Sequence, residues 1–128
     1  MQGEIKSYRD LIAWQKGILL CKQVYHVTSG FPDHERFGLT SQLRRAAVSI
    51  PSNIAEGYGR RRTQDYLRFL DVARGSLAEV DTQLVLAREL TYAAPSELSV
   101  CDQAVIELDR ILCGLVRAIQ RTAEESSK

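Results

Sequence analysis

The chain has 128 residues, 45% of them hydrophobic and 26% charged, with a net charge of +1 and three cysteines. This length and composition predict one domain over residues 1–128 with an ordinary hydrophobic core, and they exclude a disordered chain. The odd number and wide spacing of the cysteines argue against disulfides or a zinc site, so we expect reduced thiols and a cytoplasmic location. No apolar run approaches the roughly 18 residues of a membrane span, which predicts no membrane association.

Charge is unevenly distributed along the sequence. Residues 36–74 hold eight arginines and three acidic side chains, whereas residues 75–128 hold five basic and nine acidic side chains. The first segment would attract anions and the second would repel them. The same asymmetry is expected if the two segments pair with each other, between helices or between subunits.

Hydrophobic spacing predicts four helices and no strand. The first covers residues 7–29, where Ser7 and Asp10 have the spacing of a capping box. Steps of three and four residues place five side chains on one apolar face: Leu11, Trp14, Ile18, Cys21 and Tyr25. We expect Trp14 to anchor the hydrophobic core.

The second helix, residues 36–57, contains a proline. Its core stripe continues in phase on both sides of that proline: Leu39, Leu43, Ala46, Ala47, Ile50 and Ile54. Pro51 removes a backbone donor and leaves the carbonyl group of Ala47 without its helical partner. The phase favours one kinked helix, with two helices separated at the proline as the alternative. Ser49 and Ser52 are expected to help satisfy the freed backbone groups.

The third and fourth helices, residues 63–90 and 96–123, carry 3.5-residue repeats, the pattern of left-handed helix packing. In the third helix the repeat consists of Tyr66, Leu70, Ala73, Leu77, Val80, Leu84 and Ala87. In the fourth it consists of Cys101, Val105, Leu108, Leu112, Leu115 and Ile119. Thr63 is the expected N-cap of the third helix, and the tail from Glu124 is expected to fray. Long helices with short connections predict an all-α fold, an antiparallel up-down four-helix bundle.

Two helices carry more apolar surface than one bundle needs. The surplus rows are Val48, Pro51 and Ala55 in the second helix, and Ala104, Ile111 and Ala118 in the fourth. Because large exposed apolar patches are rare on monomers, these six are candidate interface residues of a homo-oligomer. The alternative is that each helix lies deep between its neighbours. The opposite, polar face of the second helix is either solvated or a contact surface for phosphate or protein: Gln42, Arg45, Ser49, Ser52, Asn53 and Glu56.

The segment SQLRRAAVSIPSNIAEG, residues 41–57, resembles a family first met as reading frames inside intervening sequences of bacterial large-subunit ribosomal RNA genes. The resemblance continues in Tyr8–Leu11, Trp14–Gln15, Phe31–Pro32 and residues 66–79. The residues that match the family motif are Pro51, Ser52, Asn53, Glu56 and Gly57.

This resemblance implies an antiparallel four-helix bundle that assembles into a ring-shaped homo-oligomer, a homopentamer. It also implies a distant similarity to the accessory variability protein of diversity-generating retroelements. That relative forms a basic pentameric barrel and binds nucleic acid and a reverse transcriptase. Most members of the family itself have no established activity.

The sequence does not indicate an enzyme. The Glu-x-x-His pairs of carboxylate-bridged di-iron bundles are missing, because Gln23 and Phe31 stand three residues before His26 and His34. Haem-attachment, phosphate-loop and H-E-x-x-H motifs are missing as well, so we expect no cofactor and no metal site.

Two functions remain open. One is a self-assembling scaffold or protein-interaction module of unestablished role, in which the arginines serve solubility or subunit pairing. The other is an oligomeric adaptor that binds RNA or DNA through an arginine-rich loop and helix face: Arg44, Arg45, Arg60, Arg61, Arg62 and Arg68. With no aromatic-rich reader motif beside them, such binding would be directed at the phosphate backbone and strongly salt-dependent.

Overall fold

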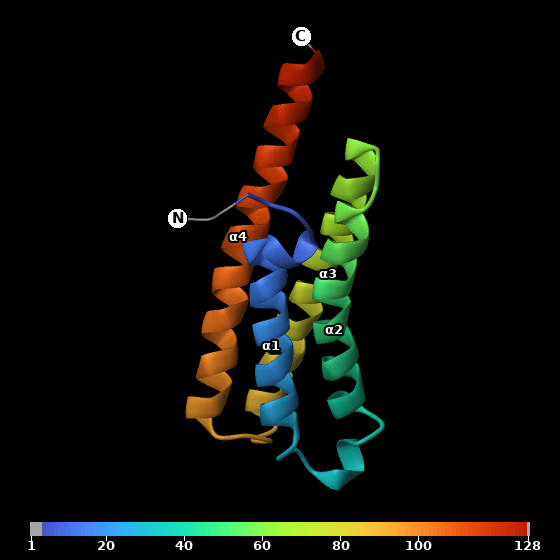
Figure 1. Ribbon diagram of the computed structural model, residues 1–128. Helices are drawn as coiled ribbons and strands as arrows, with labels where there is room; N and C mark the ends of the chain where they lie inside the picture. Colours follow the sequence, from blue (N-terminus) through green and yellow to red (C-terminus); the bar gives the residue numbers. More distant parts are fainter. Residues whose placement is uncertain (1–3, 128) are drawn as a thin grey trace.

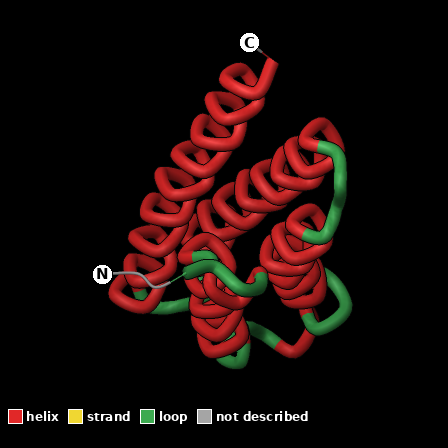
Figure 2. Tube along the Cα trace, turned by 45° about the horizontal axis from the view of Figure 1, so that its top comes forward, coloured by secondary structure: helices red, strands yellow, loops and turns green. Residues whose placement is uncertain are grey.

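The computed structural model describes residues 4–127, which form four long helices and, over that range, no strand (Figures 1 and 2). The helices are α1 (Ile12–Thr28), α2 (Leu39–Tyr58), α3 (Thr63–Glu89) and α4 (Pro95–Ser127), with short 3₁₀ turns η1 (Tyr8–Asp10) and η2 (Asp33–Glu35). They run alternately up and down, and each helix packs on two neighbours in the order α1, α2, α3, α4 around the bundle (Figure 1). The predicted antiparallel four-helix bundle is therefore confirmed.

The first helix begins later than predicted. The capping box is present, because Ser7 Oγ accepts from the Arg9 N–H and Asp10 Oδ2 accepts from the Ser7 N–H. It closes a single 3₁₀ turn, however, since Leu11 is extended with φ −73° and ψ 129°. The α-helix then starts at Ile12.

The core face of α1 also differs from the predicted apolar stripe. The buried residues are Ala13, Gly17, Leu20, Val24, Val27 and Thr28. Trp14 and Cys21 of the predicted stripe are half-buried, and Ile18 and Tyr25 are exposed. Trp14 packs against the core from its edge, with the Tyr8 ring 5.5 Å away. The stripe and the core face differ because α1 is apolar over most of its circumference, and a 3.5-residue spacing alone does not select which side is covered.

The second helix passes through its proline without interruption, which confirms one helix and excludes the two-helix alternative. The thiol of Cys21 donates to the carbonyl oxygen of Ala47, with an Sγ···O distance of 3.1 Å. Gly17 lies against the proline ring, where an added Cβ would be 3.3 Å from the Cβ of Pro51. The prediction for the serines was wrong: the freed carbonyl group is satisfied from α1, and Ser49 bonds to Ser76 and Asn53 instead.

The core stripe predicted for α2 is buried throughout, and so are the α3 repeat from Leu70 onward and the α4 repeat up to Leu112. Leu98 of α4 is a core residue that the repeat missed. Two details of the ends differ. Arg62 holds the N-cap position of α3 without a side-chain hydrogen bond, so Thr63 is the first helical residue. The helix α4 continues to Ser127, beyond the predicted end at residue 123, and fraying of the tail from Glu124 stays a prediction.

The loops at the lower end of the bundle are tied together. Tyr92, after α3, donates its hydroxyl to Glu35 Oε2 in η2 at 2.7 Å. The other carboxylate oxygen of Glu35 accepts from the Leu39 N–H at the start of α2. These two hydrogen bonds, that of Leu39 first, hold the pKa of Glu35 below its ordinary value.

Candidate interaction surfaces

The six candidate arginines form two separate groups. Arg44 and Arg45 lie in the first half of α2, whereas the stretch 60–62 follows α2 and Arg68 lies in the first turns of α3. Thirteen residues of helix lie between Arg45 and the end of α2 at Tyr58, which is roughly 20 Å at about 1.5 Å per residue, and Arg60 follows that end. A single arginine-rich surface that joins all six is therefore excluded.

Arg44 closes the end of α1. Its Nε donates to Thr28 Oγ1 at 2.8 Å, and its Nη2 donates to the carbonyl oxygen of Tyr25 at 3.4 Å. Its guanidinium group also lies 4.5 Å from the centroid of the Tyr25 ring. A cation at this position interacts favourably with the dipole at the C-terminus of α1 and with the face of the Tyr25 ring. The contacts of Arg44 are therefore those of a structural residue.

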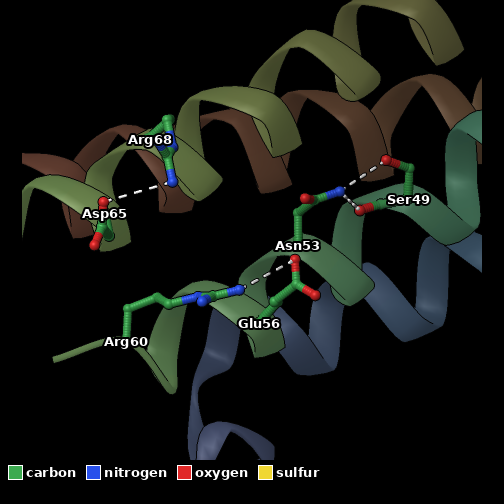
Figure 3. Close-up of polar contacts among 6 residues, drawn as sticks. All are labelled: Ser49, Asn53, Glu56, Arg60, Asp65 and Arg68. Carbon is green, nitrogen blue, oxygen red and sulfur yellow. Dashed lines mark hydrogen bonds and ion pairs between the residues drawn. The ribbon is translucent and has the colours of Figure 1, made fainter. Parts of the chain in front are cut away.

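The arginines at the α2–α3 connection surround Phe69. Arg60 and Arg68 lie 4.7 Å and 5.6 Å from the centroid of its ring. Each also approaches one carboxylate, Glu56 at 3.9 Å and Asp65 at 3.5 Å respectively (Figure 3). Sequence spacing missed this aromatic partner, because Phe69 is brought beside the loop by the packing of α3 on α2.

Arg61 and Arg62 complete the loop. Both are exposed, and neither makes an ion pair within residues 4–127. The nearby rings of Tyr58 and Tyr66 have centroids 6.2 Å apart. Burial, followed by the neighbouring Tyr58, raises the pKa of Tyr66 to about 12, so its hydroxyl stays neutral at physiological pH. The loop is thus a cationic tip with aromatic side chains at its base.

Most of the family-motif residues serve helix packing. Asn53 Nδ2 donates to the carbonyl oxygen and to the hydroxyl of Ser49, at 2.7 Å and 2.9 Å (Figure 3). The same hydroxyl lies 2.8 Å from that of Ser76 on α3. Gly57 lets the two helices meet, since an added Cβ would be 2.8 Å from the Cβ of Phe69. Ser52 and Glu56 are exposed members of the motif.

The predicted interface rows are only partly on the surface. Pro51 is buried against α1, so it has no part in a surface row. Ala104 and Ile111 are half-buried and pack on the core, whereas Ala118 is exposed. Val48 is 42% exposed, and Ala55 is half-buried one heptad further along α2.

Half-buried and exposed apolar residues lie on the outer sides of α1 and of α2, where the two helices pack on each other. We call them together the α1–α2 outer face; its members are Trp14, Ile18, Cys21, Tyr25, Val48 and Ala55. At its lower end is a hollow of about 480 Å³ whose lining includes Tyr25 and Val48 and three arginines, Arg36, Arg44 and Arg45. Phe37 projects there with 88% of its surface exposed, and the Arg36 guanidinium lies 5.4 Å from its ring centroid. This end of the face is apolar and basic, with no carboxylate in the lining.

The chain is thus a small four-helix-bundle protein. Its core is filled by apolar side chains, and its candidate interaction residues are arginines and apolar side chains on the surface. The model of one family, the 23S rRNA-intervening sequence proteins, matches residues 9–114. The chain therefore belongs to this family, which confirms the resemblance seen in the sequence.

A crystal structure has the same fold. It is that of a protein of unknown function from the S23 ribosomal protein family of Bacteroides thetaiotaomicron VPI-5482. The TM-score is 0.76 at 17% sequence identity, over 83% of this chain and 96% of that one. No curated protein matches the chain. Within residues 4–127, no helix combines the length and apolar character needed to cross a membrane.

Proposed function

We propose that the protein is a non-enzymatic, self-assembling scaffold of the cytoplasm whose copies join through the α1–α2 outer face. The observation that carries the proposal is the second apolar face of α1. Its core face is filled by Leu20, Val24 and Val27, and yet Ile18 and Tyr25 remain exposed beside the half-buried Trp14 and Cys21 at heptad spacing. A sustained 3.5-residue stripe is the pattern by which one helix packs on another.

The neighbouring helix supports the same assignment. Val48 of α2 lines one hollow with Tyr25 of α1, and Ala55 follows Val48 at a spacing of seven residues, so α2 contributes apolar side chains beside the stripe. Monomeric proteins rarely leave a surface of this kind uncovered. The resemblance of the sequence to ring-forming proteins makes a homopentamer the expected assembly.

The test compares the mass of the wild-type protein with that of a Val48→Asp variant by sedimentation velocity. We expect the wild type to sediment as an oligomer and Val48→Asp to dissociate, because a carboxylate in an apolar contact is strongly unfavourable. Val72→Asp is the matched control, since Val72 is 47% exposed on α3 and outside this face. A wild-type monomer, or equal assembly of both variants with the wild type, would refute the proposal.

A second candidate function is binding of RNA or DNA at the α2–α3 connection. It is favoured by the exposed Arg61 and Arg62, which make no ion pair among residues 4–127, beside the Arg60–Phe69 contact. Guanidinium groups on a loop can reach phosphates, and a ring would repeat the site on every copy. Single-stranded nucleic acid also stacks on aromatic side chains, which Tyr58 would provide.

This candidate is tested by fluorescence anisotropy with labelled RNA and duplex DNA, at low and at near-physiological salt. We expect salt-sensitive binding to the wild type and its loss in an Arg60/Arg61/Arg62→Ala variant. A Lys22/Arg110→Ala variant is the control, because both residues are exposed on α1 and α4, away from the α2–α3 connection. Equal binding by both variants would exclude the loop as the site.

A further inference from the structure

The outer surface of α3 and α4 carries a hollow opposite in character to the basic end of the α1–α2 outer face. It has a volume of about 320 Å³ and a floor that includes Leu77, Val105 and Ile106. Its rim carries Asp81 and Asp109, with Arg74 as its one cation. Ile106 is 52% exposed, and neither aspartate makes an ion pair within the described part of the chain. This acidic hollow is an apolar recess whose rim carries two carboxylates and one guanidinium group, a net charge of −1.

The complementary feature is the Phe37 knob, which we define as Phe37 with Arg36 and Arg45. Phe37 is the most exposed large hydrophobic side chain among residues 4–127. Neither arginine pairs with a carboxylate in that range. An aromatic ring with one guanidinium group beside it and a second arginine in the same hollow matches an apolar floor with two carboxylates at its rim in both polarity and charge.

We propose that copies of this chain join head-to-tail, with the Phe37 knob of one copy seated in the acidic hollow of the next. This inference rests on the proposed self-assembly and names the surfaces that meet. The order of the helices around the bundle sets the α1–α2 side opposite the α3–α4 side, so the two surfaces cannot meet within one copy.

A symmetric pairing of two knobs is unfavourable by comparison. It would bring Arg36, Arg44 and Arg45 of both copies together, and the lining of that hollow contains no carboxylate that could neutralise them. A head-to-tail contact instead leaves one knob and one hollow unused at the ends of every chain of copies. Assembly then continues until a ring closes, or extends as a filament where the rotation between copies does not close.

Two variants test this arrangement by sedimentation velocity. The first removes the knob by Phe37→Asp with Arg45→Glu, and the second reverses the rim by Asp81→Lys with Asp109→Lys. Each variant alone should sediment as a monomer. Mixed in equal amounts they should form a dimer and nothing larger, because the first retains an intact hollow and the second an intact knob. Circular dichroism of each variant checks that the helical content equals that of the wild type.

The outcomes separate the two proposals. If the wild type assembles and the rim variant assembles equally well, or if the mixture stays monomeric, the head-to-tail contact is refuted while self-assembly stands. A monomeric wild type refutes self-assembly itself. Glu79→Lys with Glu89→Lys is the charge-matched control, since both residues are exposed on α3 outside the hollow, and it should assemble as the wild type does.

Discussion

The contact between Cys21 and the proline-containing turn of α2 gives a prediction that can be measured as a coupling. Cys21→Ala removes the donor to the Ala47 carbonyl group, which the proline prevents from bonding within its own helix. An unsatisfied buried acceptor costs about 1–3 kcal/mol, and a thiol is a weak donor, so about 1–1.5 kcal/mol is expected. Loss of the half-buried sulfur adds roughly 0.5 kcal/mol of burial.

Pro51→Ala should abolish most of this cost. Residue 51 then has an N–H that can bond to the carbonyl group of Ala47, so Cys21→Ala removes only the packing of the sulfur. The four proteins of the double-mutant cycle should show a coupling of about 1 kcal/mol. Cys21→Ser, which keeps a donor, should cost less than Cys21→Ala in the wild-type background.

The assay is urea unfolding under reducing conditions, followed by circular dichroism. The cycle is best made in the Val48→Asp background, because dissociation of an oligomer would make the unfolding midpoint depend on protein concentration. Equal costs of Cys21→Ala with and without the proline would refute the reasoning. That result would mean that the 3.1 Å contact contributes packing alone.

Two more predictions concern glycine packing and pH. Gly57→Ala should destabilise the protein by about 1–3 kcal/mol, because its Cβ would overlap Phe69. At Gly75 an added Cβ meets nothing within 4 Å, so Gly75→Ala should instead stabilise α3 by about 1 kcal/mol. Urea unfolding of both variants shows whether close packing decides the sign of the change in the free energy of unfolding. Burial raises the pKa of Cys21 and of Cys101 from 9.0 to about 11. The thiols do not lower the free energy of unfolding below pH 9. Between pH 9 and about 11 that free energy falls, because the thiols ionise in the unfolded chain at a lower pH than in the folded protein. A Cys21→Val/Cys101→Val variant should show a smaller fall in urea midpoint over that interval; an unchanged fall would contradict the assignment to these thiols.

The sequence predicted α2, α3 and α4 well because each has one dominant apolar stripe. In α1 it failed for a physical reason: Ile12, Ile18 and Leu19 add apolar surface outside the core face. The small residues Ala13 and Gly17 were the signal that could have identified the covered side, since close helix contact needs small side chains. The predicted stripe was nevertheless informative, because it marks the outer face on which self-assembly is proposed.

The candidate site was less predictable than the fold. The six arginines lie close together in sequence, but the helix that continues from Arg45 to Tyr58 holds the first two far from the other four. The partners of individual arginines depend on tertiary packing. Arg44 meets the end of α1 and Arg60 meets Phe69 of α3, and neither contact has a local sequence pattern.

The two ends of the bundle differ in how firmly they are held. At the lower end, Glu35 joins η2 to both Leu39 and Tyr92, so an opening there must break hydrogen bonds to two connections at once. At the upper end α1 begins only at Ile12, residues 59–64 are all exposed, and most of α4 from Arg117 to Ser126 is exposed as well. Backbone amides should therefore exchange with solvent first around residues 59–63 and in the last turns of α4. The loop with Arg60, Arg61 and Arg62 could then change its conformation on binding a partner. The bundle would stay folded meanwhile, because the hydrogen bonds of Glu35 hold its opposite end.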